Sequence, residues 1–120
     1  MVSNSYVGYV YSKYVSLLMK KILQYYKLSQ IIIHFHDTRG FGLSNVVAAL
    51  DAGQVKFDAS IRGLRGCPYA LGALRVSENM ATEDFLNLLE SMWYETFINK
   101  ENLQTLCQLI PNWLPNEHLV

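Results

Sequence analysis

Two short β-branched segments on either side of a helical pattern constrain the fold of this chain most. Residues 31–36 are almost continuously β-branched or aromatic, which is typical of a strand buried on both faces. Residues 55–59 form a second, shorter run of this kind. Between them, apolar residues recur at three- and four-residue steps from Leu43 to Leu50, and Gly53 follows as a helix end. This order predicts a βαβ unit with parallel pairing and a right-handed crossover.

Further helical patterns flank the predicted unit. Apolar residues spaced three and four apart predict an amphipathic helix within residues 13–28. Thr82 is expected to cap a third helix, and Asn99 a last helix that ends before Pro111. Residues 1–12 show no clean periodicity and remain unassigned, and we identify no third strand.

Composition limits the class of protein. The 120 residues suffice for one domain, and 51% hydrophobic against 17% charged residues indicates a packed chain. Ten basic residues balance ten acidic ones, which argues against a nucleic-acid binder. The sequence contains no run of about 18 apolar residues, so we expect no membrane span. Residues 1–12 lack the basic start of a secretory signal, and two cysteines are too few for a disulfide scaffold, so we expect a cytoplasmic protein.

His34 and His36 are the first candidate site residues. A spacing of two on a strand places both imidazoles on one face, where they can reach one metal ion. Their place at the end of a predicted parallel strand favours this reading, since α/β folds build their sites there. The alternative is a pair of histidines with purely structural contacts. Asp37 and Asp58 also fall at strand ends, where we favour a cap or turn role over a ligand role.

The second candidate is Cys67, in a glycine-rich segment between residues 60 and 79 that shows no periodicity. Backbone amides or a cation can stabilise a thiolate there, so that Cys67 acts as an acid/base or a nucleophile. The alternative is a small buried hydrophobic residue, which is the role we predict for Cys107. Trp93 and Trp113 are expected to be packing residues.

Several stretches of the sequence match one enzyme family. They are HFHDTRG (34–40), Asn45 with AAL (48–50), FDAS (57–60), GLRGCPYA (63–70) and NMATED (79–84). In these motifs the chain resembles hydroxymethylglutaryl-CoA lyase, a family of metal-dependent lyases built on the TIM barrel. The histidine motif alone is shared with isopropylmalate synthases and related enzymes. The cysteine loop followed by Ala-Thr-Glu-Asp is much more particular to the lyase.

The resemblance implies a set of site residues. It places the family's metal-binding histidines on His34 and His36, its metal-binding asparagine on Asn79, and its catalytic loop cysteine on Cys67. His34 is then a catalytic candidate together with Cys67. In family terms the metal is Mg²⁺ or Mn²⁺ and the substrate is an acyl-CoA, 3-hydroxy-3-methylglutaryl-CoA, which is cleaved to acetyl-CoA and acetoacetate. The metal acidifies the substrate hydroxyl and holds its oxygen where charge builds.

The resemblance also implies a fold, an α/β part of a TIM (β/α)8 barrel. A whole barrel typically needs about 250 residues. We therefore expect a single C-terminal fragment of the lyase domain, with strands 7 and 8 at residues 31–36 and 55–59. Residues 13–110 are then barrel-like and residues 111–120 a tail. The family's early-strand Arg-Asp pair has no counterpart, so we expect little activity from the chain alone, and either a complementary barrel chain or self-association.

Two functions of different classes stay open on the sequence. The first is a metal-dependent carbon–carbon lyase whose barrel is completed from elsewhere. The second is an inactive remnant or interaction module that keeps the family signature. The chain departs from the family pattern at Arg65, Leu71 and Glu78, and Arg65 stands where a glycine would accept a positive φ. These departures bear on the geometry of Cys67 and Asn79.

Overall fold

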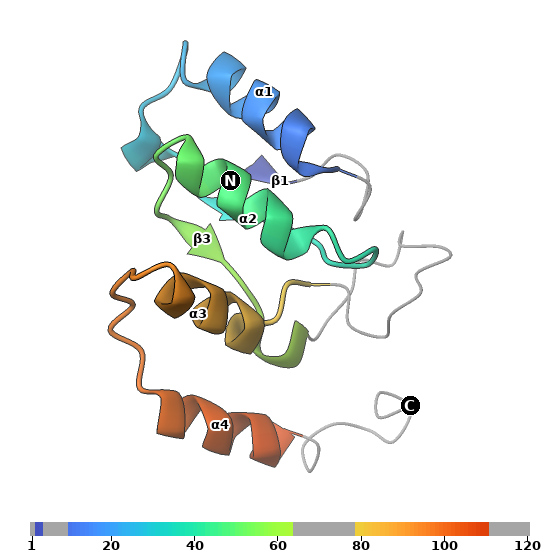
Figure 1. Ribbon diagram of the computed structural model, residues 1–120, viewed down its shortest axis with the longest axis vertical. Coiled ribbons are helices and arrows are strands. Elements are labelled where there is room, and N and C mark those ends of the chain that lie inside the picture. Colours follow the sequence, from blue (N-terminus) through green and yellow to red (C-terminus); the bar gives the residue numbers. More distant parts are fainter. Residues whose placement is uncertain (1, 4–9, 64–78, 111–120) are drawn as a thin grey trace.

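The computed structural model describes residues 2–3, 10–63 and 79–110 of the chain. Strands and helices alternate through most of this part, which confirms the α/β class (Figure 1). None of the described helices is long and apolar enough to cross a membrane. The elements, with η for a short 3-10 helix, are β1 (Val2–Ser3), α1 (Ser12–Ile22), η1 (Leu28–Gln30), β2 (Ile33–His34), α2 (Gly42–Asp51), β3 (Phe57–Asp58), η2 (Ile61–Gly63), α3 (Thr82–Ser91) and α4 (Lys100–Leu109).

The three strands form one small parallel sheet. β2 lies in the middle, with β1 on one edge and β3 on the other. Because α2 connects β2 to β3, the predicted parallel βαβ unit is confirmed. Each strand is shorter than the predicted run, with two residues in β2 and two in β3. The registers between them are Ile33 with Phe57 and His34 with Asp58.

β1 is a strand that the sequence did not predict. Val2 and Ser3 pair with Ile33 and His34, from a segment that showed no usable pattern. A strand of two residues cannot display the alternation by which strands are identified. Its pairing depends on residues far along the chain, so local sequence carries no sign of it.

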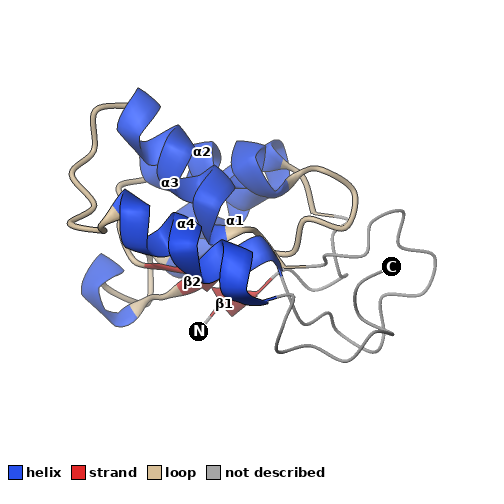
Figure 2. Ribbon diagram, turned by 90° about the horizontal axis from the view of Figure 1, so that it is seen from below, coloured by secondary structure: helices blue, strands red, loops and turns tan. Residues whose placement is uncertain are grey.

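The helices cover one side of this sheet (Figure 2). α1 packs against α2, and it buries Val15 and Met19. α1 ends at Ile22 and not near residue 28 as predicted, because the chain turns there and η1 then leads into the buried Ile31. α2 ends as predicted, with Gly53 beyond it at a φ of 92°.

Burial along the central strand is one-sided. Ile33 is 2% exposed, whereas Ile32 is 46% exposed and His34 is only half-buried. The prediction of a strand buried on both faces is therefore wrong for this part of the chain, since the helices that supply apolar cover pack on the Ile33 side. The core cluster consists of Val10, Val15, Met19, Ile31, Ile33, Phe35, Val46, Ala48, Ala49, Leu50, Met80 and Phe85.

α3 begins one residue earlier than the predicted Thr82 cap implies, and for a different reason. Thr82 is not its cap, because Ala81 occupies that position and makes no side-chain cap hydrogen bond. The backbone N–H of Thr82 donates to the carbonyl of Ser60 at 2.8 Å. Pairing with the segment after β3 therefore fixes the start of α3, and no local capping side chain is needed.

α4 is held mainly by polar contacts. Asn99 caps it as predicted, since its side-chain oxygen accepts from the N–H of Asn102 at 3.0 Å. Lys100 forms an ion pair with Glu90 of α3. Leu103 is the buried residue of this helix. α4 is therefore attached to the rest of the chain by only a small apolar contact.

Candidate metal centre

His34 and His36 lie side by side at the carboxyl end of β2. Their ring centroids are 4.9 Å apart and their planes meet at 85°. The expectation that the two side chains share one face is confirmed, and it follows from the extended backbone that places Ile33 and Phe35 on the buried face. Both imidazoles are half-buried, so they remain accessible from the side that the helices do not cover.

Asn79 joins this pair from a distant part of the sequence. Its backbone forms an antiparallel bridge with His36, and the next residue, Met80, donates its N–H to the carbonyl of Phe35 at 3.3 Å. The Asn79 N–H also donates to the carbonyl of Gly63 at 3.3 Å. The chain thus brings all three predicted metal ligands to one edge of the sheet.

A hollow of about 500 Å³ opens at this edge, a volume typical of small-molecule sites. Residues at and just after the carboxyl ends of β2 and β3 form most of its wall, and Asn79 contributes the rest together with Ile110, at the C-terminal end of α4. Parallel sheets commonly carry their ligands at this edge. The lining residues are His34, Asp58, Ala59, Ser60, Ile61, Asn79 and Ile110.

Asp58 lies in this hollow beside His34, in a role that the sequence did not predict. One of its carboxylate oxygens lies 3.4 Å from Nδ1 of His34, and the two side chains are 51% and 19% exposed. We expected a cap or turn role for Asp58. The signal that identifies it is the register, because His34 and Asp58 are direct partners across β2 and β3.

The donor set suits a divalent metal ion but does not fill its coordination. Two imidazoles and an amide oxygen are ligands that divalent first-row metals accept. Within residues 2–3, 10–63 and 79–110, no cluster of three or more His, Cys, Asp or Glu side chains gathers around one point. The described residues therefore fit a metal as a partial ligand set with open positions.

The other predicted site residues divide into two groups. Cys67 lies outside the described residues, as do Arg65, Leu71 and Glu78. Trp113 also lies outside them. Trp93 is described and is 94% exposed, so the prediction that it packs in the interior is wrong. It lies in the turn after α3 with a φ of 66°, a left-handed conformation that a bulky residue seldom adopts.

The prediction that Cys107 is a core residue is wrong. It is half-buried, and its thiol donates to a carboxylate oxygen of Glu83 at 2.9 Å. Glu83 also accepts the backbone N–H of Arg62 on both oxygens, at 3.0 and 2.9 Å. Burial, and then the hydrogen bond and negative charge of Glu83, raise the pKa of the Cys107 thiol to about 11. Cys107 is therefore a poor nucleophile at neutral pH.

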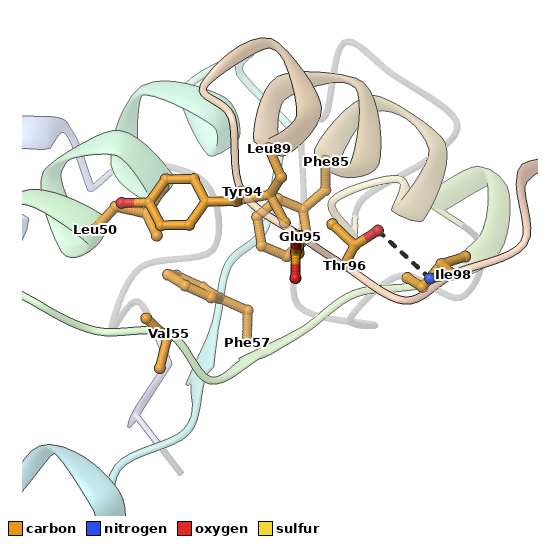
Figure 3. A pocket seen from close by; sticks show the side chains of 9 residues that line it. All are labelled: Leu50, Val55, Phe57, Phe85, Leu89, Tyr94, Glu95, Thr96 and Ile98. Carbon is orange, nitrogen blue, oxygen red and sulfur yellow. Dashed lines mark hydrogen bonds between the residues drawn. The ribbon is translucent and has the colours of Figure 1, made fainter.

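A second hollow, of about 390 Å³, is lined by side chains from α2, β3, α3 and the segment that follows α3 (Figure 3). It shares no lining residue with the hollow beside His34. Its wall is mostly aliphatic and aromatic and brings no histidine or cysteine together. The lining residues are Leu50, Val55, Phe57, Phe85, Leu89, Tyr94, Glu95, Thr96 and Ile98.

Comparison with curated proteins identifies close relatives of the chain. A hydroxymethylglutaryl-CoA lyase of Bacillus subtilis is 43% identical over 96 residues, which are 80% of this chain and 31% of that protein. The enzyme of Pseudomonas mevalonii is 52% identical over 68 residues, 57% of this chain and 22% of its own length. The human mitochondrial enzyme is 40% identical over 86 residues, which are 72% of this chain and 26% of that protein. The chain therefore spans about a third or less of these relatives. No family model matches it.

Solved structures agree with these relatives. The Bacillus subtilis HMG-CoA lyase superposes with a TM-score of 0.82 at 38% identity, covering 92% of this chain and 36% of that one. The Acinetobacter baumannii enzyme was solved with coenzyme A and 3-methylmalate. It superposes with a TM-score of 0.81 at 36% identity, covering 92% of this chain and 35% of that one. The α/β arrangement described above is thus part of the fold of those enzymes. By sequence and by structure, the chain is similar to a C-terminal portion of the hydroxymethylglutaryl-CoA lyases.

Proposed function

We propose that this chain forms the last part of a hydroxymethylglutaryl-CoA lyase barrel, with β2 and β3 as its strands 7 and 8. The parallel order of β2, α2 and β3 supports this assignment, and so does the superposition over 92% of the chain on a lyase of which it covers 36%. The reaction is the cleavage of 3-hydroxy-3-methylglutaryl-CoA to acetyl-CoA and acetoacetate. The remaining strands of the barrel come from additional polypeptide.

One observation carries the proposal, namely that His34, His36 and Asn79 meet at the carboxyl edge of the sheet. The two imidazoles and the Asn79 amide oxygen would hold a divalent ion, Mg²⁺ or Mn²⁺. When bound, such an ion acidifies the substrate hydroxyl and stabilises the negative charge on its oxygen. The open positions that this ligand set leaves are where substrate oxygens would enter.

Proton transfer is assigned to Cys67, and His34 is catalytic as a ligand of the ion that would acidify the substrate hydroxyl. The reaction removes the hydroxyl proton of the substrate, breaks one carbon–carbon bond and returns a proton to the departing acetyl-CoA carbon. The assignment of Cys67 depends on the match of the GLRGCPYA segment to the family's cysteine loop. For His34 the support is its half-buried ring at the wall of the hollow.

The substrate class and partners follow from the same proposal. An acyl-CoA substrate is consistent with the coenzyme A present in the Acinetobacter baumannii structure. A balanced charge of ten basic and ten acidic residues gives no support for nucleic-acid binding. The macromolecular partner is the polypeptide that completes the barrel, or a second copy of this chain.

Metal binding and complementation test the proposal together. Mn²⁺ binding is measured by titration calorimetry for the chain and for its His34→Ala and His36→Ala variants, and each substitution is expected to weaken binding at least tenfold. Lyase activity with Mn²⁺ is then measured for the chain alone and mixed with the upstream barrel portion of the Bacillus subtilis enzyme. We expect activity only in the mixture, and its loss with His34→Ala.

The opposite results are equally informative. A folded chain that binds no Mn²⁺ contradicts the metal assignment. Mn²⁺ binding without turnover in the mixture, while the intact Bacillus subtilis enzyme is active in parallel, contradicts the catalytic assignment and favours the inactive remnant or interaction module.

A further inference from the structure

We propose that Asp58 is a positioning residue that orients the His34 ring for metal binding. The inference rests on the proposed metal site and adds a residue to it. In this role the carboxylate accepts the Nδ1–H of His34. Nε2 then carries no proton and is the nitrogen available as a ligand.

The geometry that carries this inference is built into the sheet. His34 and Asp58 are register partners on adjacent parallel strands, so their positions are fixed by the β2–β3 pairing and not by a mobile loop. Their closest approach, from Nδ1 to a carboxylate oxygen, is 3.4 Å. Both side chains line the same hollow, together with Asn79.

The environment of the His34 ring supplies the second observation. Its Nδ1 atom is shielded from solvent and makes no well-directed hydrogen bond to any part of the chain that the structure describes. Buried polar atoms almost always have a partner, and the Asp58 carboxylate, an acceptor, supplies one when Nδ1 carries the proton. The Asp58 side chain is half-exposed and can rotate, so a small adjustment shortens the 3.4 Å approach into a hydrogen bond.

The neighbouring acidic residue is committed elsewhere. One carboxylate oxygen of Asp37 accepts the N–H of Gly42 at 2.9 Å and so holds the start of α2. A methyl group built on Gly42 would approach that oxygen to 2.9 Å, so the contact is close and specific. Asp58 is therefore the carboxylate that the described structure directs at His34.

The first test reads the tautomer of His34 directly and needs no metal. The chain contains three histidines, so ¹⁵N-histidine labelling gives a simple spectrum, and a His34→Gln variant assigns the relevant signals. At alkaline pH, where the imidazoles are neutral, we expect His34 to carry its proton on Nδ1. The Asp58→Ala variant is expected to move that proton to Nε2, the form that free imidazole prefers.

Matched variants isolate the effect of the carboxylate. Asp51→Ala makes the same change at an exposed position on α2 and should leave the His34 signals unchanged. Asp58→Glu restores a carboxylate and should recover the Nδ1–H form. Asp58→Val, which favours a strand backbone, replaces Asp58→Ala if the alanine variant folds poorly by circular dichroism.

The second test measures Mn²⁺ affinity by titration calorimetry. Loss of an outer partner of a metal-binding histidine typically costs 10- to 100-fold in affinity, and we expect a loss of about this size for Asp58→Ala. Asp58→Glu is expected to recover part of the Mn²⁺ affinity, and Asp51→Ala should bind Mn²⁺ as tightly as the wild type.

Each outcome decides between the alternatives. A His34 tautomer that is the same in the wild type and in Asp58→Ala overturns the inference. So does a loss of Mn²⁺ affinity without a tautomer change, because Asp58 would then be a direct ligand. If the wild-type chain binds no Mn²⁺, the proposed metal site fails, and the tautomer measurement alone still decides the role of Asp58.

Discussion

The side-chain amide of Gln54 donates a hydrogen bond of 2.9 Å to the backbone carbonyl of Ile31. Its side-chain oxygen accepts from the backbone N–H groups of Val55 and Lys56, at 2.9 and 3.2 Å. Gln54 is fully buried, so these contacts are shielded from water. One polar side chain thus ties the segment before β2 to the segment before β3 and sets where their pairing begins.

Replacing this side chain with an apolar one of similar size should destabilise the chain strongly. Gln54→Leu leaves the Ile31 carbonyl and two N–H groups without their partner, and we expect the free energy of unfolding to fall by about 3 kcal/mol. Urea denaturation measures the change. Gln104→Leu, the same substitution at an exposed position of α4, should change stability by less than about 0.5 kcal/mol. Equal effects of the two substitutions would contradict this role for Gln54.

Glycine should be preferred at two aromatic positions between α3 and α4. Trp93 and Phe97 have φ values of 66° and 57°, and each side chain is 94% exposed. A left-handed backbone costs a non-glycine residue about 1–2 kcal/mol, whereas glycine loses about 0.5–1 kcal/mol through its freer unfolded chain. Trp93→Gly and Phe97→Gly are therefore each expected to raise the unfolding free energy by about 0.5–1 kcal/mol.

Thermal unfolding measures these two variants, with Tyr25→Gly as the matched control. Tyr25 is 75% exposed but is not among the described residues with a positive φ. Its replacement should lower stability, since glycine gains nothing there from the backbone. A fall in melting temperature for Trp93→Gly and Phe97→Gly alike would show that their side chains make stabilising contacts.

Stability should fall at alkaline pH because of Cys107. The folded structure raises the thiol pKa from 9.0 to about 11, chiefly by burial and then through Glu83. Between these values the folded chain keeps a proton that the unfolded chain releases, so the Cys107 contribution is present below pH 9 and is lost as the pH rises toward 11. The Cys107→Ser variant should lose less stability over this interval.

The difference between the two proteins isolates the Cys107 thiol, because the rest of the chain is the same in both. Denaturant unfolding at several pH values measures that difference. A parallel decline in wild type and Cys107→Ser would contradict the assigned pKa. We also expect the Cys107 thiol of the folded chain to react slowly with iodoacetamide at neutral pH.

A preparation of these 120 residues alone is expected to self-associate or to bind complementary barrel polypeptide. The described sheet has strands of only two residues, and parallel sheets are normally covered on both faces. Helices cover one side, while Ile32 on the other side is 46% exposed. Size-exclusion chromatography with light scattering measures the mass. A monomer with a sharp, cooperative melt would refute the expectation.

Local pattern predicted the elements that depend on neighbouring residues. The helices at residues 42–51, 82–91 and 100–109 follow from apolar spacing, and the Asn99 cap follows from its side-chain chemistry. The shared face of His34 and His36 follows from the two-residue period of an extended chain. In each of these cases the physical cause lies within a few residues of the feature.

Features set by distant partners were not predictable in this way. β1 exists because Val2 and Ser3 meet β2, and α3 starts where Ser60 accepts the Thr82 N–H. The proximity of Asp58 to His34 depends on strand register, which neither segment specifies by itself. The exposure of Trp93 depends on a left-handed turn that a bulky residue seldom adopts.

The slight apolar attachment of α4 gives the chain a part that can open separately. α4 buries Leu103 alone, whereas α2 buries Gly42, Asn45, Val46, Ala48, Ala49 and Leu50. Elements with few buried contacts open locally at a lower free energy than the whole domain, and their amides exchange hydrogen first. Because Ile110 at the end of α4 forms part of the wall beside His34, each such opening would widen the approach to the histidines while the paired strands stay closed.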